Sequence, residues 1–215
     1  GLIVERIEDA GPLYVFKHAL IQEVAYSTLL RSRRQQLHGL IAAALEGRFP
    51  EVVGRQPELL ARHFAEAGLA ERAIGAFRRA GQFALSRSAS VEAATHLSHA
   101  LALLSSLPPA VMREPLELAL QTALGVALSG IGGYSAADAV SAFERARVLV
   151  RSVGSQEGVG AIFDGLFINY TNRGDLTSSM EIGREFLAIA RQSGDALSES
   201  VANRMLGVVY RVLGQ

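Results

Sequence analysis

The stretch FRRAGQFALSRSASVEAATHLSHA, residues 77–100, decides the fold that we expect for this chain. Small residues recur in it at three- and four-residue steps on both sides of a polar break: Ala80, Gly81, Ala84, Ala93 and Ala100. This spacing places the small side chains on one stripe of each of two helices. Facing small stripes let two helices approach to the short end of the roughly 8–10 Å interaxial range. We therefore expect a tight helix hairpin, in which Gly81→Leu costs about 1–3 kcal/mol by overpacking.

Related arrangements return along the chain and resemble tetratricopeptide repeats. The copies centre on Gly81, Gly125, Phe167 and Gly207, which are separated by 44, 42 and 40 residues. These spacings exceed the usual 34 residues, so the helices or turns must be longer than in the standard repeat. An ordinary bundle with alanine-rich seams, or a HEAT-like solenoid with a period of about 40–47 residues, would also fit the spacing. The resemblance implies an all-α superhelix of antiparallel helix hairpins, whose fourth copy is cut off.

Helical periodicity also predicts where the individual elements lie. The expected helices are 58–67, 70–87, 90–106, 113–130, 135–152, 157–173, 176–192 and 196–213, and short links with Gly or Pro make neighbours antiparallel. Two more helices follow Ala19, and the region Phe49 to Pro57 is expected to break the helical pattern. Residues 2–17 differ, because two β-prone runs around the turn Glu8–Pro12 predict a short β-hairpin.

Composition limits the functions open to this chain of 215 residues. With no Cys, a disulfide scaffold, a thiolate metal site and a cysteine nucleophile are excluded. Because 21 Lys+Arg balance 21 Asp+Glu, we expect no direct nucleic-acid contact and no membrane partner. No secretory signal is recognised, and polar and glycine residues interrupt the apolar stretch Leu116–Ala139, so we expect a cytoplasmic location.

Motifs that carry chemistry are absent from the sequence. A Walker A loop needs Gly-Lys followed by Ser or Thr, and the only lysine, Lys17, lacks this context. His96 and His99 stand three residues apart and could present two metal ligands, but without a third ligand we expect a packing or solvated role. Arg31-Ser-Arg33-Arg34 could contact a phosphate or an acidic partner, and a solvated helix junction is the simpler interpretation. We therefore predict no catalytic and no metal-binding residue.

The stretch YVFKHALIQEVAY, residues 14–26, closely resembles one segment of a known class of proteins. It is similar to the point where the winged-helix region ends and the helical repeats begin in bacterial multidomain STAND ATPases. The best match is to members with an N-terminal adenylate/guanylate cyclase domain, a central AAA-type ATPase and C-terminal tetratricopeptide repeats. The resemblance continues through PELLARH at residues 57–63 and then covers nearly the whole chain, most specifically in its first hundred residues.

This resemblance implies two regions and one candidate site residue. Residues 1–48 would be the end of the winged helix, with hairpin 2–17 as its wing, and residues 57–215 would be the repeats. His18 matches the histidine of the methionine-histidine-aspartate motif that contacts the β-phosphate of ADP in related receptors. Phe16 and Ala19 replace the other two motif residues, and the alternative is that His18 merely caps the turn. The segment itself would hold no cofactor, and the parent protein would bind ATP or ADP.

These expectations combine into a non-catalytic regulatory and protein-interaction segment. A protein or small effector would bind the concave helical surface, and the N-terminal edge would contact an upstream nucleotide-binding domain. The parent would be a signalling ATPase that controls cyclic-nucleotide synthesis by its adenylate/guanylate cyclase domain. The alternative is the sensor region of a LuxR-like STAND transcriptional regulator, which a C-terminal helix-turn-helix in the parent would reveal. An enzyme within these residues is disfavoured by the missing motifs.

Overall fold

The fold is described here from a computed structural model, which covers residues 3–8, 11–108, 113–133, 136–154 and 158–214. Helices dominate these residues, so the expected all-α class is confirmed. The elements are β1 (Ile3–Glu8), β2 (Gly11–Phe16), α1 (Ala19–Ser27), α2 (Arg31–Arg48), α3 (Pro50–Arg55), α4 (Pro57–Glu66), α5 (Ala70–Ser86), α6 (Ser90–Ser106), α7 (Arg113–Gly132), α8 (Ala137–Val153), α9 (Val159–Asn172), α10 (Leu176–Ser193) and α11 (Ala196–Val212).

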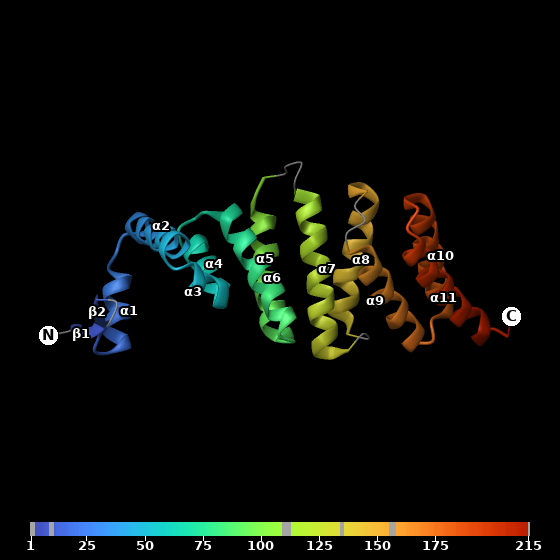
Figure 1. Cartoon of the computed structure of the whole chain (residues 1–215), viewed down its shortest axis with the longest axis horizontal. Helices are drawn as coiled ribbons and strands as arrows, with labels where there is room; N and C mark the ends of the chain where they lie inside the picture. The colour runs from blue at the N-terminus through green and yellow to red at the C-terminus, as the bar shows by residue number, and fades with distance from the viewer. Residues whose placement is uncertain (1–2, 9–10, 109–112, 134–135, 155–157, 215) are drawn as a thin grey trace.

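Helices α4 to α11 follow one another along the long axis of the molecule, and the two termini lie at opposite ends (Figure 1). Each of these helices packs against the next one in sequence. In addition, α5 contacts α7, and α7 contacts α9, so the odd-numbered helices form one layer of the stack. The result is an open array of antiparallel helix pairs, α5–α6, α7–α8 and α9–α10, with α11 as the last helix.

Glycines hold neighbouring helices close together, as the spacing of small residues predicts. A Cβ atom added to Gly81 on α5 would lie 2.7 Å from Leu97 Cγ on α6, which confirms the expected pairing of these two residues. A Cβ atom on Gly183 of α10 would likewise lie 2.9 Å from the Leu206 side chain on α11. Since real Cβ atoms do not approach so closely, Leu97 and Leu206 occupy space that only a glycine leaves free.

Two loops near the C-terminus share one mechanism for ending a helix and starting the next. Gly174 and Gly194 have φ values of +74° and +71°, the left-handed conformation that glycine adopts without steric cost. Each is followed by an aspartate that caps the next helix: Asp175 accepts from the Ser178 backbone N–H at 3.0 Å, and Asp195 accepts from that of Leu197 at 3.1 Å. Hydrogen bonds from the Ser178 and Ser198 hydroxyls, followed by those from backbone N–H groups, hold the pKa of both carboxyls below its usual range.

One helix was not expected. Residues Phe49 to Pro57 were predicted to break the helical pattern, but they contain the short helix α3. Pro50 occupies the start of α3 and Pro57 the start of α4, positions where a missing N–H costs nothing and the fixed φ of proline favours the helix. The prolines therefore start helices here, and the chain bends only at the residues before them, Phe49 and Gln56. The other predicted helices start and end within about two residues of those observed.

The N-terminal region packs loosely on the array. Strands β1 and β2 pair antiparallel, from Ile3 opposite Phe16 to Glu8 opposite Gly11, and Pro12 therefore lies in β2 instead of the expected turn. Helix α1 contacts β2 and has no buried residue, while α2 packs on α3 and α4 and buries only Ala42. The short helix α3 occupies most of the residues between the two expected regions, and Ala42 of α2 belongs to the same apolar core as Leu60 of α4, so the division into 1–48 and 57–215 stays a prediction.

Within the described residues, α7 is the one helix long and apolar enough to cross a membrane by length and composition alone. It lies between α6 and α8 and contacts both, and it also touches α5 and α9. Of its most apolar window, 22% is buried. The cytoplasmic location stays a prediction.

Candidate functional site

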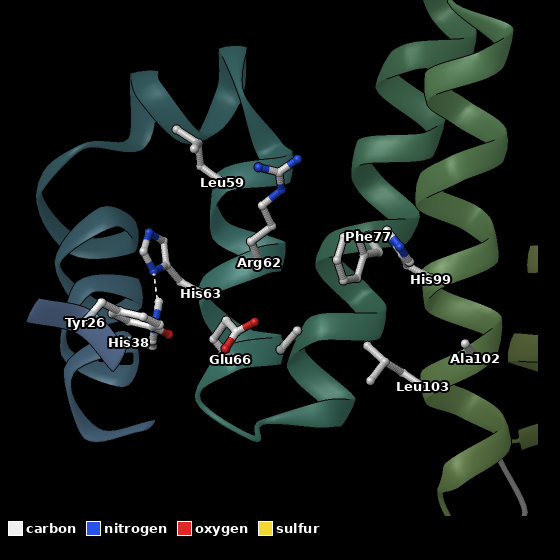
Figure 2. A pocket seen from close by; sticks show the side chains of 11 residues that line it. Tyr26, His38, Leu59, Arg62, His63, Glu66, Phe77, His99, Ala102 and Leu103 are labelled. Atoms are coloured by element: carbon white, nitrogen blue, oxygen red, sulfur yellow. Dashed lines mark hydrogen bonds between the residues drawn. The ribbon is translucent and has the colours of Figure 1, made fainter. Parts of the chain in front are cut away.

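A groove of about 690 Å³ lies at the N-terminal end of the array, between α2 and α4 on one side and α5 and α6 on the other (Figure 2). This volume is in the range of small-ligand and peptide pockets. Its lining residues come from five helices and combine apolar with titratable side chains: Tyr26, His38, Leu59, Arg62, His63, Ala65, Glu66, Phe77, His99, Ala102 and Leu103. Most of them belong to α4 and α6, which lie outside the odd-numbered layer.

One wall of the groove is a hydrogen-bonded chain of three side chains from three helices. Tyr26 Oη lies 2.9 Å from His38 Nε2, and His38 Nδ1 lies 2.8 Å from His63 Nδ1, as the dashed line in Figure 2 shows. One Nδ1 atom must donate and the other accept, so the two imidazoles cannot both carry two protons in this arrangement. The pair therefore holds a proton that it can share, and it joins α2 to α4.

The environment of His63 disfavours its charged form. Burial lowers the pKa of His63 below its ordinary value, and the neighbouring His38 lowers it further, whereas Glu66 acts in the opposite direction. A negative charge that entered the groove would add to the effect of Glu66 and favour protonation. His63 is thus placed to respond to an anionic occupant.

The opposite wall centres on Phe77, whose side chain is buried at 5% exposure. Its ring centroid lies 5.3 Å from that of His99 and 6.1 Å from that of His96. Burial is the main cause that lowers the pKa of His96, with Glu58 opposing it and His99 and Arg62 adding to it. His96 and His99, which could have presented two metal ligands, therefore pack against the Phe77 ring. Within the described ranges, no group of three His, Asp or Glu side chains could hold a metal ion.

A second cavity of about 290 Å³ adjoins the groove and shares Ala65 and Glu66 with it. Arg31 and Arg34, from the cationic cluster noted in the sequence, line this cavity at the start of α2. The Arg34 guanidinium also lies 5.2 Å above the Tyr26 ring, a cation–π contact that links the two cavities. The cluster therefore borders the same continuous surface as Arg62.

Charges on this surface are unbalanced. Its lining contains three arginines, Arg31, Arg34 and Arg62, and one carboxylate, Glu66. None of these arginines forms an ion pair with a residue that the structure describes. Some arginines elsewhere in the array are paired, as where Arg147 Nε donates to Glu185 at 2.8 Å across α8 and α10, while others, such as Arg79, form no ion pair with a described residue. The N-terminal surface thus has cationic groups free to meet an anion.

His18, the candidate nucleotide contact, lies apart from the groove lining at the N-cap of α1. Its side chain is exposed and makes no capping hydrogen bond, while its backbone carbonyl accepts from the Ile21 N–H at 3.0 Å. His18 therefore occupies the capping position of the simpler interpretation, although the cap is made by its backbone and not by its imidazole. Contact with ADP stays a prediction.

The sequence did not identify the groove. Tyr26, His38 and His63 were not singled out, because the two histidines are 25 residues apart and meet only through the packing of α2 on α4. The sequence does contain one indication of this surface: Arg34 and His38 are four residues apart, so they lie on one face of a helix.

Comparisons with known proteins give the fold and one relative. No model of a known protein family matches the chain. The uncharacterized protein R02095 of Rhizobium meliloti (strain 1021) is 38% identical over 138 residues, which are 64% of this chain and 13% of that protein. The structure is similar to the crystal structure of BtubC (BKLC) from P. vanneervenii, with a TM-score of 0.56, 16% identity, and coverage of 92% of this chain and 85% of that one. At this identity the likeness shows the fold alone.

Proposed function

We propose that this chain is a non-catalytic regulatory and protein-interaction segment of a bacterial, cytoplasmic signalling ATPase of the STAND class. Its helix pairs would be a tetratricopeptide-like superhelix, and its hairpin the wing of a winged helix. The output in the parent would be cyclic-nucleotide synthesis by an adenylate/guanylate cyclase domain. The observation that carries the proposal is an uncovered apolar surface on α1 and α2, next to an open helical array.

The uncovered surface consists of large side chains on two consecutive helices. Leu20 and Val24, one turn apart on α1, are 73% and 63% exposed, and Leu30 and Leu40 are 77% and 60% exposed. Several large apolar side chains exposed on consecutive elements are typical of a domain interface. The occupant we propose is the preceding nucleotide-binding domain of the same protein, because α1 directly follows the strands that resemble its winged helix.

The length of the relative supports a multidomain parent. The 138 matched residues are 13% of the Rhizobium protein, which is therefore a chain of roughly a thousand residues. Such a length leaves room for several further domains of ordinary size. The cyclase and ATPase domains themselves rest on the resemblance of residues 14–26 and 57–63.

Regulation would pass through the contact of α2 with α4. Occupancy of the array would favour one arrangement of this contact, and the covering domain would respond to the position of α1 and α2. The hydrogen bonds from Tyr26 to His38 and from His38 to His63 connect α1, α2 and α4. A movement of α4 would therefore be transmitted to α1 through these three side chains.

The test uses the full-length protein. Purified parent protein should bind ADP, convert ATP to a cyclic nucleotide, and change its basal rate when Leu20→Asp and Val24→Asp are introduced together. Leu197→Asp, at a 76% exposed position on α11, is the matched control and should leave the rate unchanged. Binding of DNA without cyclic-nucleotide synthesis would replace the cyclase output with a transcriptional one. Equal rates for all variants would contradict the proposed interface.

His18 is tested separately. If its imidazole contacts the β-phosphate, full-length His18→Ala should bind ADP more weakly and alter the basal activity, because a charge-assisted bond is lost. Lys17→Ala, the adjacent exposed cation, is the control. Unchanged ADP affinity and activity in the His18 variant would remove the residue from the site.

A further inference from the structure

The groove and its neighbouring cavity form one strip, because Ala65 and Glu66 line both. Leu59, Phe77 and Leu103 contribute apolar side chains to the groove. Arg62 also lines the groove, and Arg31 and Arg34 line the neighbouring cavity at the start of α2. The strip therefore combines apolar side chains with cationic groups on two helices.

We propose that this strip binds an acidic peptide segment of a partner protein, with an apolar side chain at Phe77 and carboxylates at Arg62, Arg34 and Arg31. This inference refines the interaction role proposed above. It can fail while that role stands, because it concerns one surface of the isolated chain and needs neither ATP turnover nor cyclic-nucleotide synthesis.

Charge complementarity selects the occupant. Guanidinium groups without an ion pair favour carboxylates, which they can bind in a two-pronged geometry. Glu66 lies between the two cavities and disfavours an anion directly beside it, so the carboxylates of the peptide should lie toward the arginines on both sides. A compact anion such as phosphate could meet the arginines but would leave the apolar side chains of the groove without a contact.

The histidines make binding depend on pH. Five charged or titratable side chains line the groove together with His63: Tyr26 from α1, His38 from α2, Arg62 and Glu66 from α4, and His99 from α6. A bound carboxylate favours the imidazolium form and so raises the histidine pKa. By linkage, the peptide binds more tightly at pH 5.5 than at pH 7.5, while its own glutamates stay ionised.

The experiment is fluorescence anisotropy on the 215-residue chain with a labelled probe peptide, Leu-Phe followed by a run of glutamates. The same peptide with lysines in place of glutamates is the probe control. We expect the acidic probe to bind and the basic probe not to bind. Arg31→Gln, Arg34→Gln and Arg62→Gln should each weaken binding about two- to fivefold, the range for partly exposed ion pairs.

Arg79→Gln is the matched protein control, since Arg79 is an exposed arginine on α5 outside the strip. It should leave the affinity unchanged. Circular dichroism checks that each variant is folded. Equal binding of both probes, no binding of the acidic probe, or the same loss in the Arg79 variant would overturn the proposal. Tighter binding of anionic lipid vesicles than of the acidic peptide would also overturn it, in favour of a membrane surface.

Discussion

Phe143 provides the sharpest test of the packing, because its ring lies between glycines on two neighbouring helices. A Cβ atom on Gly165 of α9 would lie 2.5 Å from Phe143 Cε2, and one on Gly125 of α7 would lie 2.6 Å from the opposite edge of the ring. Phe143 is only 2% exposed. The ring cannot retreat from one new methyl group without approaching the other helix, so Gly165→Ala must strain the array.

The magnitude follows from two opposing effects. Overpacking a core costs about 1–3 kcal/mol. Alanine gains about 1 kcal/mol over glycine in a helix interior. Gly165→Ala should therefore lose between about 0 and 2 kcal/mol of stability, while Gly207→Ala should gain about 1 kcal/mol, because no atom lies within 4 Å of a Cβ there. Helix propensity is common to both, so the difference between the two variants, about 1–3 kcal/mol, measures the overpacking.

Urea denaturation followed by circular dichroism measures this difference, and thermal unfolding should separate the two variants by about 2–4 °C per kcal/mol. Adding Phe143→Leu should make Gly165→Ala less costly than it is beside the intact ring, since the two residues are in contact. If Gly165→Ala stabilises the chain as much as Gly207→Ala, the ring is not confined and the packing account is wrong.

Three further predictions concern single positions. Ser88 adopts a φ of +58°, so Ser88→Gly should raise the stability by about 0.5–1 kcal/mol in thermal unfolding, and a loss would show that the serine side chain matters there. Burial, followed by the hydrogen bond to Glu144, raises the pKa of Tyr170 to about 12. The resulting stability is present below about pH 10, the unfolded pKa, and is lost as the pH rises toward 12, so Tyr170→Phe should flatten this decline in urea midpoints. Gly81→Leu should lower the melting temperature through its clash with Leu97, and an unchanged value would argue against their contact.

Much of the fold could be predicted because its determinants are local. Three- and four-residue steps of apolar side chains fix the helices, and residues such as Gly174 and Gly194 end them through their own backbone freedom. Pro50 shows the limit of such reasoning. Proline reads as a breaker in a sequence window, but at the first position of a helix it favours helix formation, and only the surrounding packing distinguishes the two roles.

The candidate site depended on contacts that a sequence window does not contain. His38 and His63 share a hydrogen bond although 25 residues separate them, and Phe77 meets His99 only because α5 packs on α6. The sequence did single out His96 and His99, and it gave Arg31 and Arg34 as a cluster. It could not show that the arginines lack ion pairs within the described part of the chain, which is a property of the fold.

The central claim is that the helix pairs form an open array with surfaces for docking instead of a closed globule around a site. Small-angle X-ray scattering of the chain in solution tests it most directly. A compact protein of 215 residues has a radius of gyration of about 17 Å. The account predicts a clearly larger value and the skewed distance distribution of the elongated particle in Figure 1. A value near 17 Å with a symmetric distribution would contradict it.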